Sequence, residues 1–223
     1  MILPLILLAC GLPLTVALAL RIYRPTLSPI IQITAIIISA VLLVGLGFGP
    51  LVTPGPWVLP IVTIGALWAI LVRDLRGLAL IWSWALVPIA VVIPYLVGSP
   101  SESIRGSTLM TIIGAILLLA LPANEFVSAV LDTATRKVDT PPPLPSFRGG
   151  RWIGALERIL ILLLAFTGNG IGVAVVVAAK GVIRFPEISK DEGGAKAEEF
   201  LVGSLTSWTL ATLGTLIVMT PTV

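Results

Sequence analysis

The residues best placed to do chemistry in this chain are charged side chains in or beside its last apolar stretches. They are Glu157, Arg158, Lys180, Arg184 and Glu199. An unpaired charge inside a bilayer costs at least about 2.5 to 3.5 kcal/mol, so such residues are expected to pair, to line a polar path or to act as acid and base. We predict that these five residues form an intramembrane charge cluster.

The spacing within this region predicts an ion pair between Glu157 and Lys180. A turn centred between Gly168 and Asn169 leaves the two charged residues equally far from it along two antiparallel helices. They would therefore lie at the same depth, where each offsets the cost of burying the other.

Two further charges are placed to join this pair. Arg184 lies one helical turn beyond Lys180 on the same face, and Glu199 stands near the start of the last apolar run, where it would close the cluster. The alternative is that Arg158 and Lys180 stretch separately to the lipid headgroups. That alternative explains the cations but not Glu157, which is short and anionic.

The residue inventory excludes several kinds of chemistry. The chain has no histidine and a single cysteine, Cys10, so it has neither the common zinc ligands nor an intrachain disulfide. We predict no metal site and no cofactor. Any catalysis would have to use carboxylates, lysines or hydroxyls.

Composition and charge spacing together predict a polytopic membrane protein. The chain is 57% hydrophobic and 11% charged, against about 25% charged in an average soluble domain. All but Arg105 of its 14 Lys and Arg residues lie in every second gap between apolar runs, at 21–24, 73–76, 136–158 and 180–196. The positive-inside rule assigns these gaps to the cytoplasm, so the basic residues indicate orientation and not nucleic-acid binding.

We predict an all-α fold of about eight transmembrane helices, seven in the alternative, with the N-terminus and the C-terminus outside. The predicted spans lie at about 2–20, 29–48, 57–72, 78–97, 107–135, 150–166, 170–185 and 198–218. Pro122 interrupts the fifth span just before Asn124 and Glu125, which are additional polar candidates.

The sixth and seventh spans have an alternative interpretation as one span over 159–179. A single span would place Arg158 and the basic group after Lys180 on opposite sides of the membrane, against the charge pattern. The sequence Gly168-Asn169-Gly170 also favours a turn. We therefore expect a helical hairpin.

Three regions follow from this layout. They are an N-terminal membrane group at 1–135, a cytoplasmic Pro-rich linker at 136–151 and a C-terminal membrane group at 152–223. The linker holds Pro141, Pro142, Pro143 and Pro145, which favour stiff polyproline II structure, and we favour a spacer over a docking peptide.

The last span carries small residues on one face. Beyond Glu199, these residues are Gly203, Ser207, Ala211 and Gly214. Small side chains let helix backbones approach closely in membranes, so we predict that this stripe is a helix-packing face.

Residues 149–210 combine four short motifs. They are Leu-Glu-Arg at 156–158, Ala-Ala-Lys at 178–180, Arg-Phe at 184–185 and Glu-Phe-Leu-Val-Gly at 199–203, followed by Ser207. This combination resembles the C-terminal membrane region of an uncharacterised family of bacterial multi-pass membrane proteins. The resemblance implies bacterial origin and a shared charged module, without an activity. The family often has an N-terminal segment with His and Asp, which this chain does not match.

Three classes of function are compatible with these features. The first is a non-enzymatic component or scaffold of the bacterial cytoplasmic membrane, with the lipid bilayer around it and a protein partner at its cytoplasmic face. The second is a transporter or channel in which the charge cluster lines a cavity. The third is a membrane enzyme that acts on a lipid-linked substrate through Glu157 and Glu199. The first requires least of the residues.

Overall fold

The secondary structure is entirely helical in the part of the chain that the structure describes. In this computed structural model those residues are 2–24, 26–47, 58–72, 74–75, 78–84, 104–134, 149–191 and 193–219. The helices are α1 (Ile2–Tyr23), α2 (Pro29–Gly47), α3 (Val58–Val72), α4 (Leu78–Trp84), α6 (Ile104–Leu119), α7 (Leu121–Ala134), α8 (Gly149–Phe166), α9 (Gly170–Ile188) and α10 (Ala195–Met219). The predicted all-α class is confirmed.

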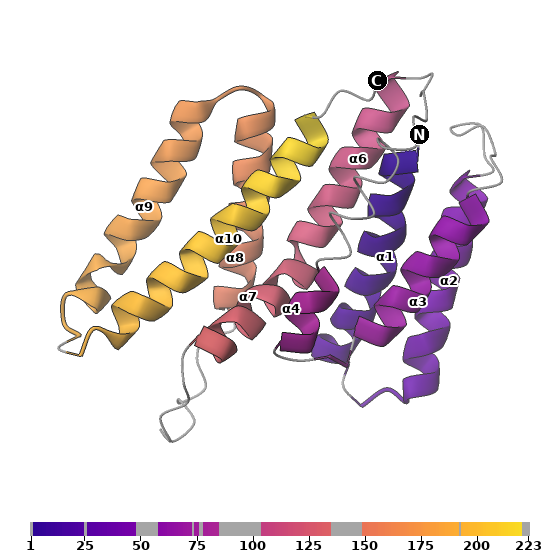
Figure 1. Ribbon diagram of the computed structural model, residues 1–223, viewed down its shortest axis with the longest axis horizontal. Helices are drawn as coiled ribbons and strands as arrows, with labels where there is room; N and C mark the ends of the chain where they lie inside the picture. Colours follow the sequence, from indigo (N-terminus) through magenta and orange to yellow (C-terminus); the bar gives the residue numbers. More distant parts are fainter. Residues whose placement is uncertain are drawn as a thin grey trace.

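The helices form two side-by-side groups (Figure 1). In the first, α1 packs against α2 and α3 on one side and against α6 on the other. In the second, α10 packs along α8 and also contacts α6 and α7, while α9 lies at the outer edge. Most of the predicted linker, 136–148, and the outer part of the predicted fourth span lie outside the described residues.

Among the described residues, three stretches of helix are long and apolar enough to cross a membrane. They are Ile6–Tyr23, Leu109–Ala134 and Ala195–Met219, and two shorter apolar stretches are Pro29–Leu42 and Pro60–Val72. The second of the three runs through the junction of α6 and α7, where Pro122 lies. These lengths support a helical protein of membrane type. The number of eight spans stays a prediction.

The predicted hairpin is present as α8 and α9. Helix α8 ends in a Schellman motif, in which Gly168 N donates to Ala165 O at 3.0 Å and Asn169 N to Leu164 O at 2.9 Å. Gly168 has a φ of 74°, a left-handed conformation that glycine adopts without strain. The Asn169 side chain then caps α9 by accepting a bond from Gly172 N. The single-span alternative is wrong, because the chain reverses here (Figure 1).

The two groups differ in how tightly their helices approach. A Cβ atom on Gly65 of α3 would lie 2.4 Å from the carbonyl oxygen of Ala9, and one on Gly114 of α6 would lie 2.6 Å from Leu7 Cβ. These glycines let α3 and α6 pack closely on α1. By contrast, none of the described side chains of α9 is buried.

Candidate functional site

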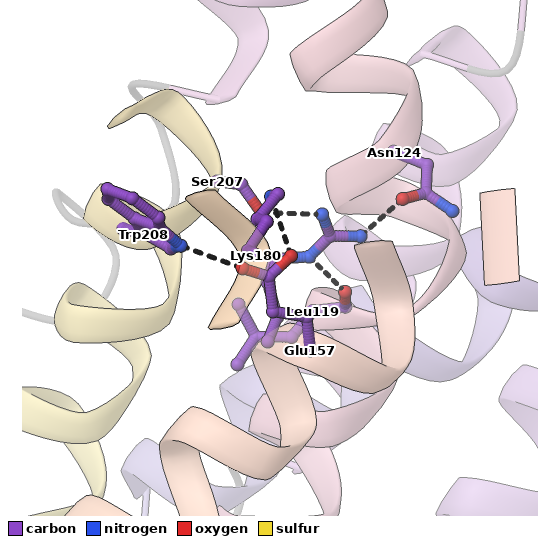
Figure 2. Close-up of polar contacts among 7 residues, drawn as sticks. Leu119, Asn124, Glu157, Lys180, Ser207 and Trp208 are labelled. Atoms are coloured by element: carbon purple, nitrogen blue, oxygen red, sulfur yellow. Dashed lines mark hydrogen bonds and ion pairs between the residues drawn. The ribbon is translucent and has the colours of Figure 1, made fainter. Parts of the chain in front are cut away.

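Arg158, near the middle of α8, is the largest fully buried side chain among the described residues, with 1% of its surface exposed. Its Nε donates to the Leu119 carbonyl at 2.8 Å, and Nη2 donates to the Ala120 carbonyl at 3.1 Å and to Asn124 Oδ1. Nη1 donates to Ser207 Oγ at 3.1 Å. We refer to Arg158 and these four acceptors as the arginine clasp. Figure 2 shows three of the acceptors, Leu119, Asn124 and Ser207.

The position of the clasp follows from the break between α6 and α7. Pro122 has no N–H, so the regular helical hydrogen-bond ladder cannot continue through it. The carbonyls of Leu119 and Ala120 lie at this break, just before Pro122, and Arg158 donates to both of them. A guanidinium has five N–H groups in a rigid fork, which suits it to hold several acceptors at once.

The clasp joins three parts of the chain. Asn124 lies in α7, Ser207 in α10 and Arg158 in α8, so one side chain links the C-terminal group to the end of the N-terminal group. Charge-assisted hydrogen bonds of this kind are roughly twice as strong as neutral ones. The alternative in which Arg158 stretches to the lipid headgroups is therefore wrong: its guanidinium is buried and bonded inside the helix bundle.

Glu157, the preceding residue, makes a different set of contacts. Its Oε2 accepts a hydrogen bond from Lys180 Nζ at 2.6 Å, and its Oε1 accepts one from Trp208 Nε1 at 2.8 Å. Lys180 Nζ also lies 5.7 Å from the centroid of the Trp208 ring, within the range of a cation–π interaction. We refer to these three residues as the carboxylate–indole site (Figure 2).

The ion pair expected from the hairpin register is thus present, but the cluster is smaller than predicted. Arg184 is exposed and pairs with Glu187 on its own helix. Glu199 is also exposed. Residues four apart drift about 40° around a helix at each step, because 3.6 residues make one turn, so Glu199 lies well to the side of Ser207. The extension of the cluster to Arg184 and Glu199 was wrong for this reason.

The small-residue stripe of α10 lies where the helix meets its neighbours. Ser207, Ala211 and Gly214 are buried, and a Cβ atom on Gly214 would lie 3.0 Å from Leu119 Cδ1. Gly203 is half-buried, and a Cβ atom on it would lie 3.5 Å from Leu131 Cδ1. The face therefore packs the helix, and Ser207 also serves as an acceptor in the clasp.

The two additional polar candidates have different roles. Asn124 is a member of the clasp, whereas Glu125 is a half-buried residue on the next position of α7. Trp208 was missed, although a tryptophan within an apolar span carries an N–H that needs a partner. The main-chain acceptors at Leu119 and Ala120 were also missed, because Pro122 indicates only that the helix breaks near them.

Among the described residues, no group of three or more His, Cys, Asp or Glu side chains is arranged to hold a metal ion. Glu157 is buried and bonded to Lys180 and Trp208, whereas Glu199 is exposed, so the two carboxylates occupy different environments. The geometry favours a structural role for the charges.

Comparisons with known proteins do not indicate a function for this chain. No protein-family model, curated protein or solved structure matches the chain. The resemblance to a bacterial membrane family stays a prediction.

Proposed function

We propose that this protein is a non-enzymatic helical component of the bacterial cytoplasmic membrane, a scaffold subunit whose buried charges hold its helices together. The observation that carries the proposal is the arginine clasp. Arg158 is 1% exposed and donates four hydrogen bonds to groups of the same chain. A cation used in this way fixes helix positions, whereas a transport path needs charges that face water or substrate.

The arrangement of helix ends supports the proposed orientation. The connections from α1 to α2 and from α9 to α10 lie at one end of the molecule (Figure 1). Arg24 and Lys190 lie in these connections, and Arg21 and Lys196 lie in the adjoining helix ends. The start of α1, the α8–α9 turn and the end of α10 lie toward the other end. This agrees with a cytoplasmic end rich in basic residues and with both termini outside.

Cysteine labelling in intact cells tests the orientation. In a Cys10→Ser background, single cysteines at Ser28 and Lys190 should resist a membrane-impermeant maleimide until the cells are opened. A cysteine at Asn169 should react in intact cells. If Lys190 and Asn169 label alike, the hairpin does not cross the membrane and the proposed topology fails.

A partner at the cytoplasmic face is the functional part of the proposal. A photo-crosslinking amino acid at Lys190, in the connection from α9 to α10, should trap one polypeptide of defined size in growing cells. The same amino acid at Asn169, at the opposite end of the hairpin, is the matched control. Equal products from the two sites, or none from Lys190, would count against a cytoplasmic partner.

Transport is the second candidate, because Lys180 keeps 24% of its side-chain surface exposed beside the buried Glu157. Flux of protons and monovalent cations into liposomes that contain the purified protein separates the two functions. We expect no flux above that of protein-free liposomes. Flux that is saturable and lost in Glu157→Gln would favour the transporter.

A further inference from the structure

The carboxylate–indole site combines two firmly held groups with one loosely held group. Glu157 comes from α8 and Trp208 from α10, two helices that pack along each other. Lys180 comes from α9, which has no buried residue among those described and lies at the outer edge (Figure 1). The carboxylate and the indole can therefore stay in place while the lysine moves.

A molecule from outside the protein reaches the Glu157 carboxylate from the side where Lys180 lies. The Glu157 side chain is 7% exposed, whereas that of Lys180 is 24% exposed. Next to Lys180, a Cβ atom on Gly181 would have no atom within 4 Å. A small molecule that reaches Glu157 would thus meet Lys180 first and would have space beside it.

The neighbouring arginine leaves the carboxylate available to another cation. Arg158 donates to Leu119, Ala120, Asn124 and Ser207, and it has no direct bond to Glu157 among the hydrogen bonds of the described residues. One oxygen of Glu157 is held by the Trp208 N–H, and the other receives the ammonium of Lys180. Removal of Lys180 would leave one buried carboxylate oxygen without a donor.

A carboxylate oxygen beside the ring of a tryptophan is chemistry that recognises an ammonium group. We propose that Glu157 and Trp208 form a binding site for a small primary ammonium group, and that Lys180 is its displaceable resident. The ligand must carry an N–H, and a primary ammonium reproduces the lysine group that now donates to Glu157 Oε2 at 2.6 Å. A quaternary ammonium has no N–H to donate.

The size of the probe follows from the lysine. Lys180→Ala removes the last three carbons and the ammonium, so the n-propylammonium ion replaces what is lost. Tetramethylammonium has the same charge without a donor and serves as the control cation. Displacement of Lys180 from the wild-type site should also loosen α9, because none of the described residues of this helix is fully buried.

The test uses the full chain in nanodiscs made of phosphatidylglycerol and phosphatidylcholine. In Lys180→Ala, n-propylammonium should raise the Tm along a saturating curve and recover about half or more of the loss, because it binds the folded state only. Tetramethylammonium at equal concentration should not. The double variant Glu157→Gln/Lys180→Ala should show no saturable rise. A rise equal for both cations, or one that persists in the double variant, would overturn the binding site.

The wild-type protein tests whether the lysine is displaceable. Saturating n-propylammonium should shift the indole N–H resonance of Trp208, identified by its loss in Trp208→Phe, and should speed amide exchange several-fold within 170–188 and not within α8. Rescue of Lys180→Ala with no change in the wild-type protein would overturn that part of the proposal. These readouts need no partner and no flux, so their failure is separate from that of the scaffold function.

The ammonium group could come from a free amine or from the ethanolamine headgroup of a lipid. Nanodiscs in which phosphatidylethanolamine replaces phosphatidylcholine distinguish these sources. If the lipid alone raises the Tm of Lys180→Ala, and does so only when Glu157 is intact, the headgroup is the ligand. If only added n-propylammonium does so, the ligand is a soluble amine.

Discussion

Arg158 and Lys180 are both cations of the α8–α9 hairpin, and the fold uses them in opposite ways. Arg158 is buried and bonded to four acceptors on α6, α7, α10 and the α6–α7 junction. Lys180 is partly exposed and makes one hydrogen bond, to Glu157, from a helix with no buried residue among those described. The two residues carry the same charge, so the packing of the helix that carries each one decides whether its hydrogen bonds are permanent or exchangeable.

The chemical types match this division. Arginine presents a rigid, always-charged fork that suits several fixed acceptors, whereas lysine carries a compact charge on a flexible stem. The clasp gains from rigidity because two of its four acceptors are main-chain carbonyls that cannot move far. The carboxylate–indole site needs only one donor.

The largest effect should come from removing the arginine. Arg158→Leu leaves the Leu119 and Ala120 carbonyls, Asn124 and Ser207 without their donor, and we expect a loss of about 3 to 5 kcal/mol in unfolding free energy or a protein that fails to accumulate. Arg158→Lys should recover only part of this, because an ammonium cannot span all four acceptors. Thermal unfolding in detergent and protease resistance in membranes measure both variants.

The same measurements can contradict the proposed difference between Arg158 and Lys180. If Arg158→Leu unfolds within about 1 kcal/mol of the wild-type protein, the clasp is no more important than an exposed pair. In that case the buried arginine would not distinguish the two regions.

The second effect compares glycines in the two regions. Gly65→Ala would place a Cβ atom 2.4 Å from the Ala9 carbonyl oxygen, and the backbone of α1 would have to move, at a cost of roughly 1 to 3 kcal/mol. Gly181→Ala on α9 is the matched control, because its Cβ atom would have no neighbour within 4 Å. It should be neutral or stabilise by up to about 1 kcal/mol through helix propensity. Chemical denaturation in mixed micelles measures both, and a destabilised Gly181→Ala would mean that α9 is packed more tightly than its exposure indicates.

A third, smaller effect concerns the ion pair. Glu157→Gln keeps the shape of the side chain but removes its charge, and we expect a loss of about 1 to 2 kcal/mol, since the pair is only partly buried. A double-mutant cycle with Lys180→Met should give a coupling of about 1 kcal/mol. Thermal unfolding supplies the four values. A coupling as large as the loss in Arg158→Leu would remove the distinction between the two cations.

Sequence reasoning located the hairpin and its ion pair because both depend on local signals. Gly168 and Asn169 mark the turn, and the equal distances of Glu157 and Lys180 from it need only helix geometry. Most helix ends followed in the same way from proline, glycine and charge, but α9 continues through Pro186 to Ile188, three residues beyond the predicted end. What failed, the membership of Arg184 and Glu199, depended on the rotation of each helix about its axis.

The clasp was beyond reach because half of its acceptors belong to the main chain. No side chain in the sequence indicates that the carbonyls of Leu119 and Ala120 accept hydrogen bonds from Arg158. Whether they do depends on how α8 and α10 pack against the α6–α7 break. Pro122 indicated a break but not its partner. Contacts between residues 38 or 39 positions apart require the tertiary arrangement, which the periodicity of a single helix does not contain.

The smallest effect should come from Arg184, the cation that sequence spacing wrongly joined to the cluster. Its side chain is 54% exposed and pairs with Glu187, which is 61% exposed, one turn away on the same helix. Exposed pairs of this kind contribute at most a few tenths of a kcal/mol, so Arg184→Ala should change the unfolding free energy by less than about 0.5 kcal/mol. Thermal unfolding at low and high salt provides the check, with Lys180→Ala measured in parallel. If Arg184→Ala and Lys180→Ala lose the same free energy of unfolding at both salt concentrations, Arg184 belongs to the charge cluster. The carboxylate–indole site would then extend to the solvated end of α9.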